Sequence, residues 1–196
     1  MASSQAQPER GARTLGGLLK IENTETDVNS NSKDAFSAEL SPTYSVFIAE
    51  KLAIGGRLGY GYSRNYTTSS TKAVTSQTHA VPISLFVQYY HWLSPQVALT
   101  VRGGVNYRLG FIGDKTYTIA SQQDTIVRST SRSTRLFASP SVLWMPDKHW
   151  GVELNAVGLE YGNDARLDKD GTAYSTTNAF RLNLSSAVGL GLYYYF

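Results

Sequence analysis

The sequence predicts an all-β fold, an eight-stranded antiparallel up-and-down transmembrane β-barrel. Three observations carry the prediction: apolar and polar residues alternate with a period of two, strand-like segments recur an even number of times, and their connections alternate between short and long. A period of two places successive side chains on opposite faces of a strand. A closed barrel with a lipid-facing wall and a polar interior requires this pattern.

The alternation is clearest in Val97–Phe111, where every second residue is apolar or aromatic, apart from one glycine, and the residues between are mostly polar or glycine. Two other segments with this alternation are Phe36–Val46 and Phe180–Phe196. The register predicts that Leu99 and Leu190 face lipid, whereas Thr100 and Gly189 face the interior. Strands of this length suit a tilted membrane crossing, which needs roughly 9 to 11 residues.

Eight segments fit a strand: Leu15–Asn23, Ala35–Ile48, Leu52–Arg64, His79–Trp92, Val97–Lys115, Thr134–Met145, Trp150–Tyr161 and Asn178–Phe196. Three connections are tight, namely Ala49–Lys51, Leu93–Gln96 and Pro146–His149. Four are long and polar, namely Thr24–Asp34, Asn65–Thr78, Thr116–Ser133 and Gly162–Thr177. Short turns on the side of both termini and long loops on the other side are typical of bacterial outer-membrane barrels.

Two features of the chain modify this simple layout. Pro42, Pro82 and Pro140 fall within predicted strands, and because proline cannot donate to a ladder we expect a local bulge or a strand end at each.

Residues 1–14 form a tail before the barrel domain of residues 15–196. Ser4-Gln5-Ala6 has small residues where a signal peptidase reads. The tail is therefore either the remnant of a signal peptide or an unstructured terminus.

A soluble barrel that binds a ligand inside also alternates with period two, but its apolar face points inward. Here the polar face carries bulky charges that could form ion pairs within a narrow lumen: Lys20, Glu22, Glu39, Arg57, Arg102, Arg108, Arg135, Glu153 and Arg181. Aromatic residues gather at strand ends, and the tryptophans Trp92, Trp144 and Trp150 border the short turns. Both features favour a lipid-facing apolar wall with an aromatic girdle.

The chain ends on an aromatic residue, Phe196, with Tyr194 two residues earlier and Gly191 five residues before the end. This ending resembles the C-terminal signal by which the assembly machinery recognises outer-membrane barrels, although that pattern often has a polar residue where Gly189 stands. Sequence segments of the predicted hairpins, such as Leu40-Ser41-Pro42 and Trp150-Gly151-Val152-Glu153-Leu154, add to this resemblance. From about residue 15 onward the chain resembles the small outer-membrane barrels of the Bacteroidetes, with the architecture of OmpX and the OmpA membrane domain. The resemblance implies an outer-membrane location with both termini periplasmic.

Composition excludes several classes of function. The 196 residues include no cysteine, so disulfides, thiolate metal sites and cysteine nucleophiles are excluded. The net charge is only +3 and basic residues are scattered, which argues against a nucleic-acid partner. We therefore expect one domain with no cofactor.

The sequence contains only weak signals for catalysis, metal binding or transport. His79, near Ser76 and Thr78 in sequence, is the one candidate for a lipid A-modifying enzyme, since such barrels place a His and a Ser near the outer leaflet. Asp164, Asp168, Asp170 and Gly171 suggest a calcium loop, but their spacing misses the full pattern. The charged lumen raises the alternative of a small passive channel, although eight strands leave room only for side chains.

The leading expectation is a structural or surface-interaction protein of the outer membrane, with no catalytic activity. Its expected partners are outer-membrane lipid, the barrel assembly machinery during biogenesis and an extracellular glycan or protein bound through the four polar loops. Loops on a rigid scaffold commonly carry recognition.

Overall fold

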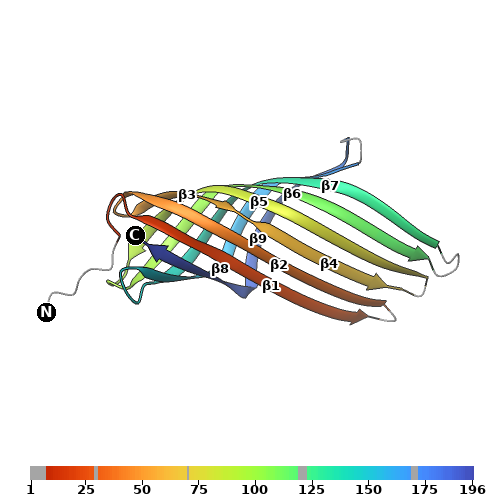
Figure 1. Cartoon of the computed structure of the whole chain (residues 1–196), viewed down its shortest axis with the longest axis horizontal. Coiled ribbons are helices and arrows are strands. Elements are labelled where there is room, and N and C mark those ends of the chain that lie inside the picture. Colours follow the sequence, from red (N-terminus) through yellow and green to blue (C-terminus); the bar gives the residue numbers. More distant parts are fainter. Residues whose placement is uncertain (1–7, 29–30, 70, 119–122, 169–171) are drawn as a thin grey trace.

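The computed structural model is a closed ring of antiparallel strands (Figure 1). The structure describes residues 8–28, 31–69, 71–118, 123–168 and 172–196. The strands are β1 (Arg13–Val28), β2 (Asn31–Ala49), β3 (Leu52–Leu58), β4 (Tyr60–Thr68), β5 (Lys72–Trp92), β6 (Val97–Thr118), β7 (Gln123–Trp144), β8 (Trp150–Leu167) and β9 (Ala173–Tyr195). Apart from β3 and β4, which do not pair with each other, each pairs with its neighbour in sequence, and β1 also pairs with β9, which closes the ring. The predicted up-and-down topology is confirmed.

The nine strand segments occupy eight positions in the ring, because β3 and β4 both lie between β2 and β5. The break between them is at Gly59, whose N–H donates to the carbonyl of Pro82 at 2.8 Å. A Cβ at Gly59 would collide with Ser41 and Pro82. The register on both sides of the break is the same, so β3 and β4 correspond to the single strand predicted for Leu52–Arg64.

The prolines behave differently from one another. Pro42 and Pro82 lie inside the continuous strands β2 and β5, so the bulge or strand end expected at each is wrong. The interruption falls instead between β3 and β4, on the strand that lies between β2 and β5. Neither Pro42 nor Pro82 can donate a backbone hydrogen bond to that strand, because proline has no N–H. At Pro140 the expectation is confirmed, since the pairing of β7 with β8 shifts by one residue between Ala138 and Ser141.

The strands are much longer than the alternation of apolar residues predicts. Apart from β3 and β4 they contain 16 to 23 residues, and the 22 residues of β6 span about 70 Å at 3.3 Å per residue. The four segments expected to be long loops are therefore mostly paired strand, and this expectation is wrong. A sequence rich in serine and threonine suggests a loop when it is considered alone. Such a segment nevertheless forms a strand when a neighbouring strand continues beside it and offers partners for pairing.

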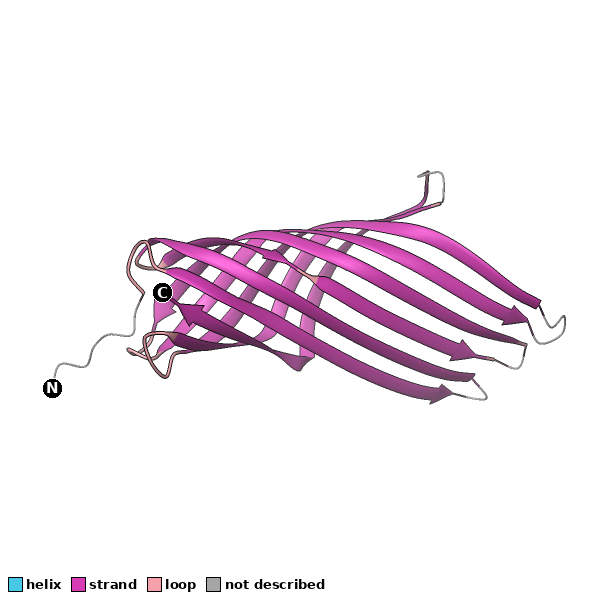
Figure 2. Ribbon diagram, in the orientation of Figure 1, coloured by secondary structure: helices cyan, strands magenta, loops and turns pink. Residues whose placement is uncertain are grey.

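The three predicted tight connections and both ends of the barrel chain lie at one end of the barrel, here called the turn end (Figure 2). The opposite end is called the loop end. Hydrogen bonds join the turns to one another and to the neighbouring strands: the Met145 N–H donates to the carbonyl of Gln96 and the Tyr195 N–H to that of His149, both at 2.7 Å. Among the described residues, no helix is long and apolar enough to cross a membrane.

Candidate functional site

The outer wall of the barrel is apolar over its turn-end half. Side chains exposed to the outside alternate with buried ones along each strand, as Leu99 (43% exposed) and Thr100 (1%) illustrate. On β5 Leu85 is 70% exposed, and on β6 Val101 is 49% exposed. The facing predicted for Leu99 and Thr100 is confirmed, whereas the side chains of Leu190 and Gly189 lie outside the described part of the chain. An apolar surface of this extent is unusual on a protein surrounded by water.

Two groups of aromatic residues border this apolar wall. The turn-end group consists of Trp144, Trp150, Tyr194 and Phe196, and their side chains are 39 to 55% exposed. The loop-ward group consists of Phe36, Tyr60, Tyr62, His79 and Phe111, in which the Tyr60 hydroxyl and the His79 Nδ1 are 2.6 Å apart. This arrangement matches the two interfacial bands of a membrane barrel.

Trp92 departs from the girdle expected for the three tryptophans. It shares an inward-facing register with Tyr90, stacks on it at 6.3 Å, and packs against a buried cluster inside the barrel. That cluster fills the interior at the turn end and consists of Phe47, Ala53, Tyr90, Ala98, Leu143, Met145, Tyr193 and Tyr195, each at most 5% exposed. Side chains from β2, β3, β5, β6, β7 and β9 therefore pack together and fill the interior at this end.

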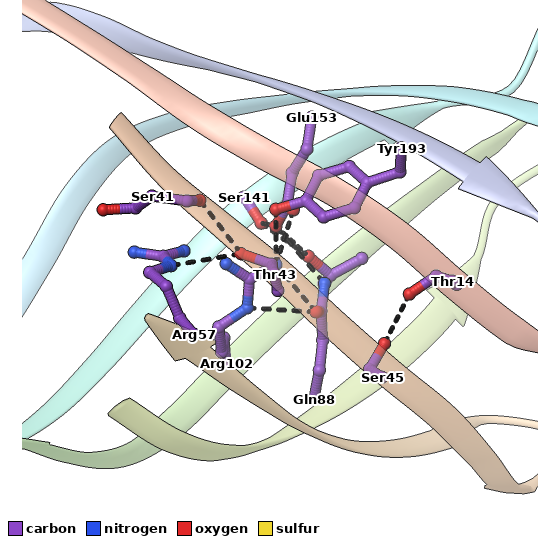
Figure 3. Close-up of polar contacts among 11 residues, drawn as sticks. Thr14, Ser41, Thr43, Ser45, Arg57, Gln88, Arg102, Ser141, Glu153 and Tyr193 are labelled. Carbon is purple, nitrogen blue, oxygen red and sulfur yellow. Dashed lines mark hydrogen bonds and ion pairs between the residues drawn. The ribbon is translucent and has the colours of Figure 1, made fainter. Parts of the chain in front are cut away.

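A buried polar layer lies directly on the loop-end side of this cluster. Figure 3 shows the polar contacts among its side chains. At its centre Arg102 and Glu153 form an ion pair of 2.7 Å, with side chains only 5% and 2% exposed. Arg102 also donates to the Gln88 amide oxygen at 2.8 and 3.0 Å and to the Tyr193 hydroxyl at 3.1 Å. The guanidinium lies 4.8 Å from the centre of the Phe86 ring.

The carboxylate of Glu153 is fully engaged. Its oxygens accept hydrogen bonds from Ser141, from Thr100 at 3.3 Å and from the Gln88 amide at 3.3 Å, besides the arginine. A charge taken out of water is costly unless it is paired and hydrogen-bonded, and here both conditions are met. The layer thus holds strands β5, β6, β7, β8 and β9 together across the interior.

The structure divides the predicted lumen charges into separate groups instead of one network. Lys20 pairs with Glu22 at 2.8 Å. Arg108 lies 3.4 Å from Glu39, and Arg57 donates to the Thr43 hydroxyl beside the polar layer. Arg135 binds two residues absent from the prediction, Glu160 at 3.0 Å and Asp164 at 2.9 Å. Arg181 lies in β9 opposite Glu160, and its side chain is outside the described part of the chain.

Sequence reasoning missed Glu160 because β8 contains an extra residue between Asn155 and Leu159 relative to β7. Outward positions before the bulge are even-numbered, as at Leu154, and afterwards odd-numbered, as at Leu159. The bulge therefore turns Glu160 inward, and simple alternation from Glu153 gives the wrong face. Gln88 could have been found, since it is a polar residue between the inward-facing Phe86 and Tyr90.

The candidate chemical sites are not assembled. His79 faces outward beside Tyr60 and Tyr62, whereas Ser76 and Thr78 occupy the opposite face of the same strand, so the pairing that the enzyme alternative needs is absent there. The Asp168 carboxylate accepts from the Thr172 N–H at 2.9 Å, while Asp170 and Gly171 lie outside the described residues. Within the described chain no group of acidic or histidine side chains could hold a metal ion.

Comparison with known proteins shows likeness at the level of architecture. No protein-family model matches the chain, and no curated protein matches it. A major outer membrane protein of Thermus thermophilus is 16% identical, with a TM-score of 0.48, and the alignment covers 96% of this chain and 100% of that one. OprG of Pseudomonas aeruginosa is 12% identical, with a TM-score of 0.46 and coverage of 98% and 99%. Ail of Yersinia pestis is 11% identical, with a TM-score of 0.42 and coverage of 95% and 99%.

Proposed function

We propose that this protein is an integral barrel of the bacterial outer membrane with a structural or surface-interaction role. The observation that carries the proposal is the division of the wall into two faces: exposed aliphatic residues between two aromatic groups outside, and a buried ion pair with hydrogen-bonded polar groups inside. In lipid every backbone polar group must be bonded internally, which a closed barrel achieves. A soluble ligand-binding barrel would have the opposite polarity.

The turn end is proposed to face the periplasm, because both termini and the tight connections lie there. Gly191, Tyr194 and Phe196 are proposed to form the assembly signal. Tyr194 stacks on Phe196 at 6.1 Å and both project from the outer wall, where a machine that inserts strands into lipid could contact them. Deleting Phe196 should lower the amount of barrel in the membrane far more than it lowers the stability of barrels already formed. Normal membrane yield of the deletion variant would reject this role.

The interior favours a closed barrel over a channel. The cluster at the turn end and the Arg102–Glu153 layer together bury side chains contributed by β2, β5, β6, β7, β8 and β9. Eight strands enclose just enough space for such side chains. Single-protein conductance in planar bilayers should therefore stay at the background of the lipid alone, and well-resolved ion-selective steps would overturn this part of the proposal.

The surface-interaction role is proposed for the loop end, where polar strand segments extend beyond the apolar wall. On β4 and β5 these segments are rich in Ser and Thr and contain Asn65 and Gln77, and the hydrogen bonds of such side chains suit glycan or protein surfaces. Shortening two facing hairpins by equal numbers of residues should preserve the folded barrel and abolish binding of the ligand to cells. If the shortened protein behaves like the parent, recognition is not located there.

Electrophoresis with and without boiling tests the central proposal. A membrane barrel resists SDS when cold and migrates differently after heating, so the purified protein should give two mobilities. The protein should also partition with outer-membrane vesicles and resist extraction by alkaline carbonate. A single mobility together with release into the soluble fraction would refute the membrane location.

A further inference from the structure

A hollow of about 670 Å³ lies on the outside of the barrel near the loop end, over β5, β6 and β7, which run side by side there (Figure 1). The register of the strands identifies the residues that form its floor. Gln77 pairs with Gly113 and Gly113 with Arg128, while Thr75 pairs with Lys115 on the adjoining row. All of these positions have the outward register, which is that of Leu85 on β5, Leu99 on β6 and Leu136 on β7.

Gly113 creates the hollow. A Cβ placed on it would meet no atom within 4 Å, although the neighbouring outward positions on β6 carry the large side chains of Phe111 and Lys115. The missing side chain leaves a depression between two cations, Lys115 and Arg128, both of which line it. Arg64 pairs with Gln77 from the other side, on the same outward face.

The charge distribution around the outer wall is uneven. Positions with the outward register carry the cations Arg64, Lys115, Arg128 and Arg132 on β4, β6 and β7, together with one acid, Asp124 on β7, whereas on β1 and β2 near the loop end they carry the acids Glu25, Asp27 and Asp34. Two acids are also among the lining residues. Asp114 has the inward register, and Asp168, at the edge, accepts a hydrogen bond from the Thr172 N–H. The charged lining residues that have the outward register, Lys115 and Arg128, are therefore both cationic.

The hollow continues directly into the apolar wall. His79 and Phe111 form its turn-ward edge, and toward the turn end β5 presents Ile83, Leu85 and Val87, at 42 to 70% exposure. If the cations hold the anionic group of a ligand, the apolar part of the same ligand would therefore lie along this aliphatic strip. Basic residues next to an apolar membrane surface attract anionic lipids, and Arg and Lys are the usual partners of phosphate oxygens.

We propose that this hollow binds the phosphate-bearing headgroup of an anionic membrane lipid, with Lys115 and Arg128 contacting the phosphate and the acyl chains lying along β5 and β6 toward the turn end. The inference rests on the membrane location proposed above. It assigns a specific lipid site to the outer wall and needs no catalytic step.

The test is native mass spectrometry of the full chain released from nanodiscs of phosphatidylcholine with a minor fraction of phosphatidylglycerol. The parent should retain phosphatidylglycerol preferentially. A Lys115→Gln/Arg128→Gln double variant should lower that retention by about tenfold or more, since each cation beside a membrane contributes several-fold to anionic-lipid attraction. The matched control is Lys33→Gln/Lys72→Gln, which removes the same charge at the same end from positions whose register faces the interior.

A second variant separates the shape of the site from its charge. Gly113→Leu fills the hollow without removing a cation and should also abolish the preference. Gly103→Leu adds the same side chain to the outward face of the apolar wall, where a Cβ would meet only the Phe137 carbonyl oxygen at 3.6 Å, and should leave retention unchanged.

Equal retention by the parent and by both site variants would overturn the proposed lipid site. So would an equal loss in the Lys33/Lys72 control, because attraction would then depend on net charge alone. Failure of the parent to enter nanodiscs at all would instead refute the membrane location, which separates the two failures.

Discussion

Removing Arg102 should be among the most damaging single substitutions in this protein. Arg102→Met eliminates an ion pair of 2.7 Å together with the hydrogen bonds to Gln88 and Tyr193, and it leaves Glu153 ionised at 2% exposure. Breaking a buried pair by deleting one partner costs about 3 to 5 kcal/mol. Because Ser141, Thr100 and Gln88 still donate to the carboxylate, we expect the lower half of this range.

The companion double variant tests the physical reason. Arg102→Met combined with Glu153→Leu replaces both charges with apolar groups, which is often neutral or stabilising for a buried pair. The free energy of unfolding of the double variant should therefore return close to that of the parent, although each of the two single substitutions destabilises the protein, so the two losses should be strongly non-additive. Tyr193→Phe removes only one hydrogen bond to the guanidinium and should cost about 1.5 to 3 kcal/mol at most.

The assay is equilibrium unfolding by guanidinium in detergent micelles, followed by tryptophan fluorescence. Trp92 packs against the cluster beside the polar layer and therefore reports on this part of the interior. A cost below about 1 kcal/mol for Arg102→Met, smaller than any buried-pair deletion should give, would refute the reasoning. So would a double variant whose loss equals the sum of the two single losses, since the charges would then act independently.

Three further predictions concern the wall and the turns. Leu85→Arg, at a 70% exposed site, should lower the free energy of unfolding by about 2 to 4 kcal/mol, and Leu93→Arg, near the interface, should lower it by about 0 to 1 kcal/mol. If both variants resist SDS equally well, Leu85 does not face the middle of the membrane. Gly104→Ala should destabilise the barrel by about 1 to 3 kcal/mol, because its Cβ would collide with the β5 backbone, whereas Gly103→Ala should be neutral in the same guanidinium titration. The backbone N–H groups of His149 and Trp150 donate to the Asp147 carboxylate and hold its pKa below the ordinary value. The stabilisation from these hydrogen bonds is present above the unfolded pKa and is lost as pH falls through the lower folded pKa. Hydrogen exchange of those amides should accelerate in that acid range relative to neighbouring turns, and Asp147→Ala should remove the difference.

The amino-acid sequence by itself determined the number of strands, their order and the face that each presents over the apolar segments. Residues such as Leu99 and Val101 alternate with Thr100 and Arg102, and the pleat of a strand converts that alternation into two faces wherever the strand lies. Hairpin connections of three or four residues then leave neighbouring segments little choice but antiparallel pairing. These properties are local, so they can be predicted without the fold.

The tertiary structure alone decided how far the strands extend, which charges meet and where the alternation reverses. Polar hairpin arms continue as strand because the partner strand offers backbone hydrogen bonds, a condition that their own sequence does not reveal. Arg102 and Glu153 are 51 residues apart, and only closure of the ring brings them across a lumen with the right spacing. The bulge in β8 that turns Glu160 inward depends on Pro140 of the neighbouring strand, which cannot donate to the ladder. Each of these features is a relation between distant segments, and a relation of that kind exists only once the barrel has closed.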